Sequence, residues 1–160
     1  MLSPTYLHKD QVDKLMLLSF YNETNKYYYC SEYTNYENIS NDKTSNYNEI
    51  SMVSISDDDK TIHGILYAYI DRPERKISNM SMIKFKEDSI LFGLDFLEFL
   101  RYIFFERNMY KVEFGVIIGN PVEKMYDKFI KKYGGKVIGI KKKTRMLADG
   151  KYYDRKLYEI

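Results

Sequence analysis

The segment that most limits how this chain can fold is a strand that leads directly into a capped helix. Residues 110–118 largely alternate apolar and polar side chains, as in a strand with one buried face. Asn120 follows at a helix N-cap position, Pro121 at the first helical position and Glu123 three residues after the cap. This order is typical of a capping box with proline in its preferred place. The sequence therefore predicts a strand, a tight connection and a helix over 121–133.

The predicted helix has a single apolar face. Its apolar side chains recur at spacings of three and four residues, and Gly134 and Gly135 end the pattern. The face consists of Val122, Met125, Tyr126, Phe129, Ile130 and Tyr133. Tyr126 is thereby aimed inward, near the helix start and the end of the preceding strand. A tyrosine on such a face is most often a packing residue. A phenol held there can also donate a proton to a molecule bound at the helix start.

The composition indicates one globular domain. Of the 160 residues, 44% are hydrophobic, and the single cysteine, Cys30, excludes an internal disulfide. We expect a cytoplasmic protein, since the N-terminal residues also lack a signal-peptide pattern. Two histidines and one cysteine argue against a metal site. A net charge of +2 argues against a nucleic-acid partner. The most apolar run, 90–105, contains charged residues and does not suit a membrane.

The remaining patterns predict a mixed fold of the α/β (α+β) class. A helix signal over 9–20 precedes a tyrosine-rich segment, 21–48, which we interpret as a short helix with loops. A three-stranded meander follows, and then two helices alternate with the last strands. The predicted strands lie at 52–55, 62–70, 77–86, 110–118, 136–143 and 151–160, and the second helix at 93–107. This order predicts one domain with a mixed, mostly antiparallel central sheet, helices on both faces and parallel crossovers near its centre.

The order of elements from residue 50 onward and several short stretches carry a family resemblance. The stretches are Gly93–Tyr102, Tyr110–Phe114, Asn120 with Tyr126, Gly134–Gly135 with Gly139, and the closing Asp149–Tyr158. They resemble the GNAT superfamily of N-acetyltransferases, which use acetyl-CoA. The resemblance implies a cofactor-binding core over 51–160 and an acceptor-side region over 1–50. It also implies that Asn120, besides capping its helix, contacts the pantetheine arm of acetyl-CoA, and that Tyr126 is the general acid.

The same resemblance places a pyrophosphate-binding loop before the helix at 93–107. There, backbone amides at a helix N-terminus would bind the pyrophosphate. The amides belong to Ser89, Ile90, Leu91, Phe92 and Gly93. The family pattern is Gln/Arg-x-x-Gly-x-Gly/Ala, but the matching residues are Asp88, Leu91 and Gly93, so only the last glycine is kept. Asp88 adds a negative charge near the phosphates, which Lys84 and Lys86 could offset.

In this family the strand before the loop parts from its parallel neighbour. Its free backbone groups then pair with the pantetheine amides, much as an added strand would. The matching strand is Met80–Phe85, and we assign cofactor contacts to Ile83 and Phe85. Gly115 in the facing strand would ease the separation or mark a bulge.

The resemblance implies direct transfer of an acetyl group from acetyl-CoA to a primary amine of a small molecule or peptide. The general base stays open between Glu113, His63 and a water molecule. The altered loop supports a second hypothesis, in which a GNAT-fold protein has lost catalysis and acts as a binding or regulatory module. A third, an interaction protein whose basic surface includes Lys141–Lys143, is disfavoured by the near-neutral net charge. The sequence is compatible with a homodimer.

Overall fold

The computed structural model describes residues 1–20, 27, 48–58, 60–147 and 149–160. The short helix and loops predicted for 21–48 lie almost entirely outside this part of the chain. In chain order the elements are β1 (Leu2–Pro4), η1 (Thr5–His8), α1 (Lys9–Phe20), β2 (Glu49–Ile55), β3 (Ile62–Asp71), β4 (Lys76–Lys84), α3 (Ile90–Arg101), η3 (Tyr102–Glu106), β5 (Lys111–Ile117), α4 (Glu123–Tyr133), β6 (Lys136–Met146) and β7 (Tyr152–Glu159).

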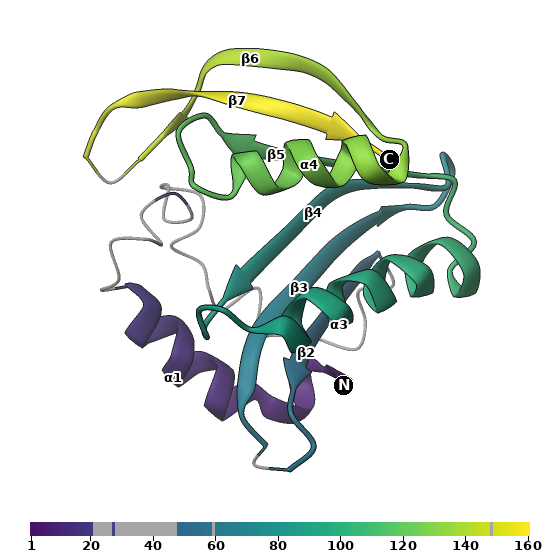
Figure 1. The fold of residues 1–160 in the computed structure, drawn as a ribbon, viewed down its shortest axis with the longest axis vertical. Coiled ribbons are helices and arrows are strands. Elements are labelled where there is room, and N and C mark those ends of the chain that lie inside the picture. The colour runs from purple at the N-terminus through teal and green to yellow at the C-terminus, as the bar shows by residue number, and fades with distance from the viewer. Residues whose placement is uncertain (21–26, 28–47, 59, 148) are drawn as a thin grey trace.

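The described strands form one sheet in the order β1-β2-β3-β4-β5-β7-β6 (Figure 1). Its neighbouring strands are antiparallel except for β4 and β5, which are parallel and connected through α3. β7 pairs with both β5 and β6, so the last strand lies between the two strands that α4 connects. The predicted mostly antiparallel sheet is confirmed. Of the two predicted parallel crossovers, the one through α3 connects neighbouring strands near the centre, whereas the one through α4 connects β5 to β6 at the edge, with β7 between them.

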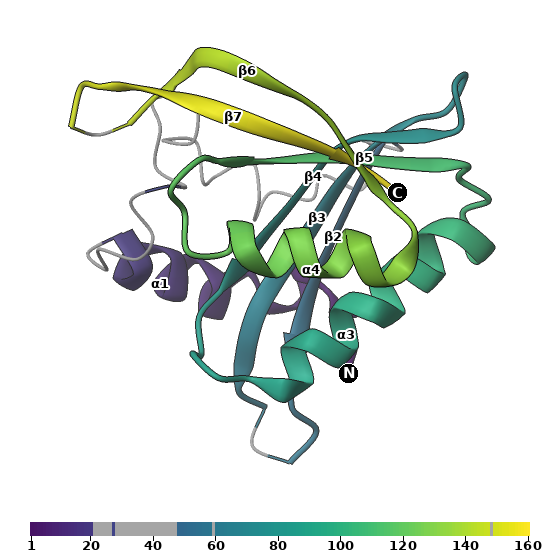
Figure 2. The ribbon, with the colours of Figure 1, turned by 45° about the horizontal axis from the view of Figure 1, so that its top comes forward.

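Helices cover both faces of the sheet, as predicted: α3 and α4 lie on one face and α1 on the other (Figure 2). The alternation of side chains along β3 explains how one strand serves both layers. Leu66 and Ala68 are buried in the core with α3 and α4, whereas Ile65 is buried in a second core with Val12 and Met16 of α1. β3 is therefore packed on both of its faces.

The second predicted helix starts earlier than expected. Its pattern predicted a start at residue 93, but α3 begins at Ile90 because Ser89 caps it. The side-chain oxygen of Ser89 accepts a hydrogen bond from the backbone N–H of Phe92, with a distance of 3.0 Å. The helix then ends in a π-helical turn, η3. The early cap moves the N-terminus of α3 next to the end of β4.

Candidate functional site

β4 and β5 are paired at one end of the sheet and part at the other. The paired residues are Lys76 with Lys111, Ile77 with Val112 and Met80 with Phe114. Beyond the last pair, β4 continues to Lys84 and β5 to Ile117. On its other edge β5 stays paired with β7 throughout this stretch. The predicted parting is therefore present, and it leaves backbone groups of β4 facing a gap rather than a strand.

These backbone groups do not belong to the residues predicted for cofactor contact. The N–H of Phe85 donates to a carbonyl oxygen of β3 at 2.9 Å. The carbonyl oxygen of Ile83 also faces β3, since a Cβ built on Gly64 would lie 2.4 Å from it. Because backbone groups alternate in direction along a strand, Met82 and Lys84 present theirs to the gap. The backbone groups that face the gap therefore belong to the neighbours of Ile83 and Phe85, while the side chain of Phe85 lines the cavity described below.

The contacts around Gly115 exclude one of the two predicted reasons for a glycine there, the bulge, and add another. β5 and β7 pair without a register shift around this residue, so there is no bulge here. A Cβ at Gly115 would lie 2.5 Å from Nε of Arg155 and 3.0 Å from Cδ2 of Leu157. The close approach of these β7 side chains accounts for the glycine without reference to the gap.

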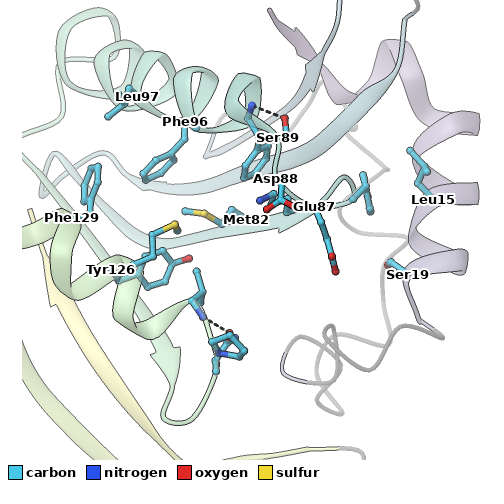
Figure 3. A pocket seen from close by; sticks show the side chains of 18 of the residues that line it. Leu15, Ser19, Met82, Glu87, Asp88, Ser89, Phe96, Leu97, Tyr126 and Phe129 are labelled. Atoms are coloured by element: carbon cyan, nitrogen blue, oxygen red, sulfur yellow. Dashed lines mark hydrogen bonds between the residues drawn. The ribbon is translucent and has the colours of Figure 1, made fainter.

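The gap opens into a cavity of about 770 Å³ between α1, the end of β4 and the N-terminal ends of α3 and α4 (Figure 3). Most of the predicted site residues meet here. Those that line the cavity are Phe85, Ser89, Phe92, Gly93, Asn120 and Tyr126. Ile83, Ile90 and Leu91 lie outside the lining set: Ile83 is buried against α1, and Ile90 is 79% exposed.

Sequence reasoning missed much of the cavity wall. The additional residues include Leu15, Leu18 and Ser19 of α1, Phe96 and Leu97 of α3, and Met82, Met125, Phe129 and Tyr133. The signal for part of this wall was present, because Met125, Phe129 and Tyr133 share the helix face of Tyr126. For α1 the sequence held no such signal, since a helix face alone does not say which part of the sheet it covers.

At the N-terminal end of α4, the predicted capping residues Asn120 and Glu123 form hydrogen bonds, but not those of a capping box. Asn120 is buried, and its Oδ1 accepts from the N–H of Val122 at 3.0 Å. The Glu123 carboxylate accepts from the N–H of Gly119 at 3.2 Å, rather than from that of Asn120. The helix begins at Glu123, two residues later than predicted, because Pro121 and Val122 belong to the preceding turn. The polar side chains thus fix the turn as well as the helix.

Tyr126 lies where the sequence predicted, on the inward face of α4 near its start. Its side chain is 7% exposed. Its ring meets the ring of Phe114 edge-on, with centroids 5.2 Å apart and an interplanar angle of 84°. Figure 3 shows its hydroxyl pointing into the cavity, toward the side of Met82. The packed ring and the cavity-facing hydroxyl make Tyr126 both a core residue and a candidate proton donor.

The N-terminal end of α3 is held by β3. Nδ1 of His63 lies 2.6 Å from Oγ of Ser89, the oxygen that also caps α3. Gly93, one turn into the helix, borders open space, since a Cβ there would meet nothing within 4 Å. A helix N-terminus carries partial positive charge and unpaired N–H groups, so this end of the cavity can receive an anion.

Charged side chains of both signs reach the cavity at the same end. Glu87, Asp88 and Lys84 are exposed and line it. Asp88 has a φ of 57°, in the left-handed region that aspartate adopts more readily than most residues. The two carboxylates oppose anion binding at the helix N-terminus, and the Lys84 ammonium partly offsets them.

The two side chains predicted as candidate bases lie outside the cavity lining. His63 supports the cap of α3, as described above. Glu113 forms an ion pair with Lys111 at 2.8 Å. It alternates with the core residues Val112 and Phe114, which places it on the opposite face of the sheet. Neither residue is therefore positioned to take a proton from a molecule in the cavity.

In the described part of the chain, no three His, Cys, Asp or Glu side chains gather in a way that could hold a metal ion. None of its helices combines the length and apolar character needed to cross a membrane.

No protein-family model and no curated protein matches the sequence, but solved structures match the fold. The spermidine N-acetyltransferase from Vibrio cholerae in complex with CoA and spermine aligns over 100% of this chain and 94% of its own, with a TM-score of 0.76 and 18% identity. A chimera of the Vibrio cholerae enzyme SpeG and hSSAT aligns over 92% of this chain and 89% of its own, with a TM-score of 0.69 and 18% identity. A probable acetyltransferase aligns over 73% of this chain and 64% of its own, with a TM-score of 0.61 and 17% identity. The chain therefore has the fold of the GNAT N-acetyltransferases, as its sequence predicted.

Proposed function

We propose that this protein is an N-acetyltransferase that moves an acetyl group from acetyl-CoA to a primary amine of a small molecule or peptide. The observation that carries the proposal is the parting of β4 and β5 into a cavity that the Tyr126 hydroxyl faces. The fold match to an enzyme crystallised with CoA and spermine supports both the cofactor and the acceptor class.

The residues of the cavity fit the two halves of acetyl-CoA. Its pyrophosphate needs N–H donors and room, which the start of α3 and the bare surface at Gly93 provide. Its pantetheine arm carries amides, which suit the gap-facing backbone groups of Met82 and Lys84 and the side chain of Asn120. Asn120 keeps its capping bond in this role, because an amide side chain has both an acceptor and donors.

Bound acetyl-CoA would supply the acetyl group as a thioester, whose sulfur departs as a thiolate when an amine takes the acetyl group. Tyr126 Oη donates a proton to that leaving group and regains one from solvent. Gap-facing N–H groups of β4 stabilise negative charge on the acyl oxygen. The apolar side chains of Phe96 and Phe129, whose ring centroids are 5.3 Å apart, keep water from the inner wall of the cavity. A water molecule serves as the first acceptor of the amine proton.

A second candidate function is a binding or regulatory module that retains the fold without catalysis. The observation that favours it is the pair of carboxylates, Glu87 and Asp88, at the end of the cavity where the pyrophosphate would bind. Such a module would hold the cofactor weakly or not at all, because the charges there oppose the helix N-terminus.

Titration calorimetry with acetyl-CoA, followed by turnover assays, separates the two functions. We expect the wild-type chain to bind acetyl-CoA in the micromolar range and to release CoA in the presence of spermine, tyramine or a short peptide with a free N-terminus. Tyr126→Phe should bind equally well but lose about 10²–10⁴-fold in kcat, the usual contribution of a general acid. Tyr110→Phe, at an 80% exposed tyrosine, is the matched control and should leave kcat unchanged.

Absence of acetyl-CoA binding by the wild-type chain would reject the enzymatic proposal and favour the binding module. Full activity of Tyr126→Phe would keep the enzyme but remove the role assigned to Tyr126.

A further inference from the structure

Three aromatic rings meet beneath the candidate active site. Tyr158 of β7 is fully buried, and its ring stacks on that of Phe114 with centroids 5.1 Å apart and an interplanar angle of 16°. Tyr126 meets Tyr158 edge-on, at 5.9 Å and 78°, in addition to its contact with Phe114. Edge-to-face contacts of this kind are favourable and directional. The two stacked rings therefore form a platform that limits how the Tyr126 ring can tilt.

The hydroxyl of Tyr158 connects this platform to α4. It donates to Oδ1 of Asp127, the residue directly after Tyr126, at 2.9 Å. Burial raises the pKa of the Tyr158 hydroxyl, so it stays protonated and remains a donor. A phenylalanine would fill the same space without desolvating a hydroxyl. The hydroxyl of Tyr158 is therefore not needed for packing; it adds a hydrogen bond that attaches β7 to α4.

The attachment is reinforced by a lysine of the same strand. Nζ of Lys156 donates to the same Asp127 oxygen at 2.7 Å and lies 3.4 Å from Oε1 of Glu123. A hydrogen bond with Lys156 lowers the pKa of the Asp127 carboxyl, so Tyr158 donates to a carboxylate, which gives a stronger bond than a neutral acceptor. The other oxygen of Glu123 holds the N–H of Gly119, directly before Asn120. One strand thereby fixes the first turns of α4 and the turn before it.

From this arrangement we infer that Tyr158 is a positioning residue for Tyr126: its ring supports the Tyr126 ring, and its hydroxyl, bound to Asp127, sets the rotation of α4 that points the Tyr126 hydroxyl into the cavity. The inference rests on the proposed function, because positioning matters only if Tyr126 donates a proton. It predicts that the Tyr158 hydroxyl acts on catalysis solely through Tyr126.

A double-mutant cycle tests this. The assay follows CoA release with acetyl-CoA and whichever of spermine, tyramine or the short peptide gives the highest rate. Tyr158→Phe should lower kcat about tenfold through misplacement of the proton donor, with KM for acetyl-CoA unchanged. In a Tyr126→Phe background, Tyr158→Phe should cause no further loss, because the group that it positions is already absent.

Asp154→Asn is the matched control. It removes a carboxylate from the same strand, one that pairs with Lys142 at 2.8 Å on the hairpin. Its kcat should equal that of the wild type. Should Tyr158→Phe fail to fold, Asp127→Ala takes its place in the cycle, because it removes the same hydrogen bond, together with the Lys156 contact, from a partly exposed position and keeps the Tyr158 ring.

The outcomes distinguish a failure of the positioning role from a failure of the proposed function. An equal loss of kcat in both backgrounds, or no loss in either, would overturn the positioning role while leaving the proposed function intact. A wild-type chain without turnover would reject the proposed function instead. In that case, NMR of protein labelled with ¹³C-tyrosine tests whether Tyr158 sets the position of the Tyr126 ring. If Tyr158→Phe shifts the ring signal of Tyr126, the inference is supported. If the signal does not shift, the inference is overturned.

Discussion

The two helices that border the cavity, α3 and α4, present their N-terminal ends to it in different ways. α4 is attached through polar side chains: Asn120 caps the preceding turn, and Glu123 links that turn to Lys156 of β7. α3 depends on close approach to β3, where Gly64 admits the ring of Phe92 and His63 meets the capping oxygen of Ser89.

Because of this difference, the N-terminal end of α3 can border the cavity without the expected loop sequence, whereas that of α4 relies on its own capping residues. The loop before α3 departs from the expected family pattern at Asp88 and Leu91, yet the position of the helix depends on other residues, on β3. Asp88 therefore changes the charge at this end of the cavity, while contacts with β3 set its shape. Substitutions at Gly64 and Asp88 can therefore separate shape from charge at α3, and one at Asp127 probes the charged attachment of α4.

Among the substitutions that test how α3 and α4 are held, Gly64→Ala should have the largest effect, a loss of stability. The new Cβ would lie 2.4 Å from the carbonyl oxygen of Ile83 and 2.4 Å from the ring of Phe92. Because the backbone oxygen cannot move freely, we expect a loss of about 1–3 kcal/mol in the free energy of unfolding, as for other overpacked sites. Urea unfolding measures this loss, and calorimetry should show weaker binding of acetyl-CoA as the start of α3 is displaced.

Gly93→Ala is the control for Gly64→Ala, because its Cβ would enter open space. A glycine-to-alanine change within a helix should stabilise the fold by about 0.5–1 kcal/mol, while the added methyl group narrows the space offered to the pyrophosphate. If Gly64→Ala unfolds at the same urea concentration as the wild type, then close packing against β3 does not position α3.

A smaller effect is expected from removing the charge of Asp88. Asp88→Asn keeps a residue that tolerates the left-handed backbone of this position. It also removes a negative charge from the anion end of the cavity. Affinity for acetyl-CoA should rise by about 1 kcal/mol, or roughly fivefold, at low salt, and the gain should shrink as salt screens the charge. The measurement is calorimetry at two salt concentrations.

Asp58→Asn removes the same charge from an exposed turn and should not change the affinity. An Asp88→Asn variant that binds no more tightly than the wild type would show that Lys84 already neutralises the carboxylate, or that no anion binds at this end.

The residues whose placement the sequence predicted best are those with short-range signals. The face that carries Tyr126, the glycine stop of its helix and the succession of helices and strands along the chain from β2 onward follow from periodicity and capping within about a dozen residues of chain. The start of α3 was missed by three residues, because a lone serine is a weak cap signal beside an apolar run. The predicted opening between β4 and β5 came from the family resemblance, not from a local pattern.

Features set by contacts between distant segments could not be predicted. Whether Ile83 or Met82 faces the gap depends on the register between β3 and β4, and a shift of one residue reverses every backbone direction. The reason for Gly115 lies in Arg155, forty residues later, which reaches it through the pairing of β5 and β7. Tyr158 likewise gave no sign of its role, since the sequence alone does not bring it next to Asp127.

The smallest effect concerns the charged attachment of α4 and its dependence on pH. A hydrogen bond with Lys156 lowers the pKa of Asp127 in the folded protein. A carboxyl whose pKa is lower in the folded than in the unfolded state contributes stability above its unfolded pKa of about 3.9, and this stability is lost as the pH falls through the folded pKa. Asp127→Asn should therefore destabilise the protein more at pH 6 than at pH 3.

The size of this pH-dependent loss of stability depends on how far the Asp127 side chain is exposed to solvent. The Asp127 side chain is 44% exposed, so solvent screens the pair and only a few tenths of a kcal/mol are expected at pH 6. Asparagine still accepts the hydrogen bond from Tyr158, so the substitution isolates the charge from the aromatic platform. Urea unfolding of both proteins at the two pH values measures it. An equal difference at pH 6 and pH 3 would mean that the Asp127 charge adds nothing to the attachment of α4 to β7, which the Tyr158 hydrogen bond and the Glu123–Lys156 contact would then provide.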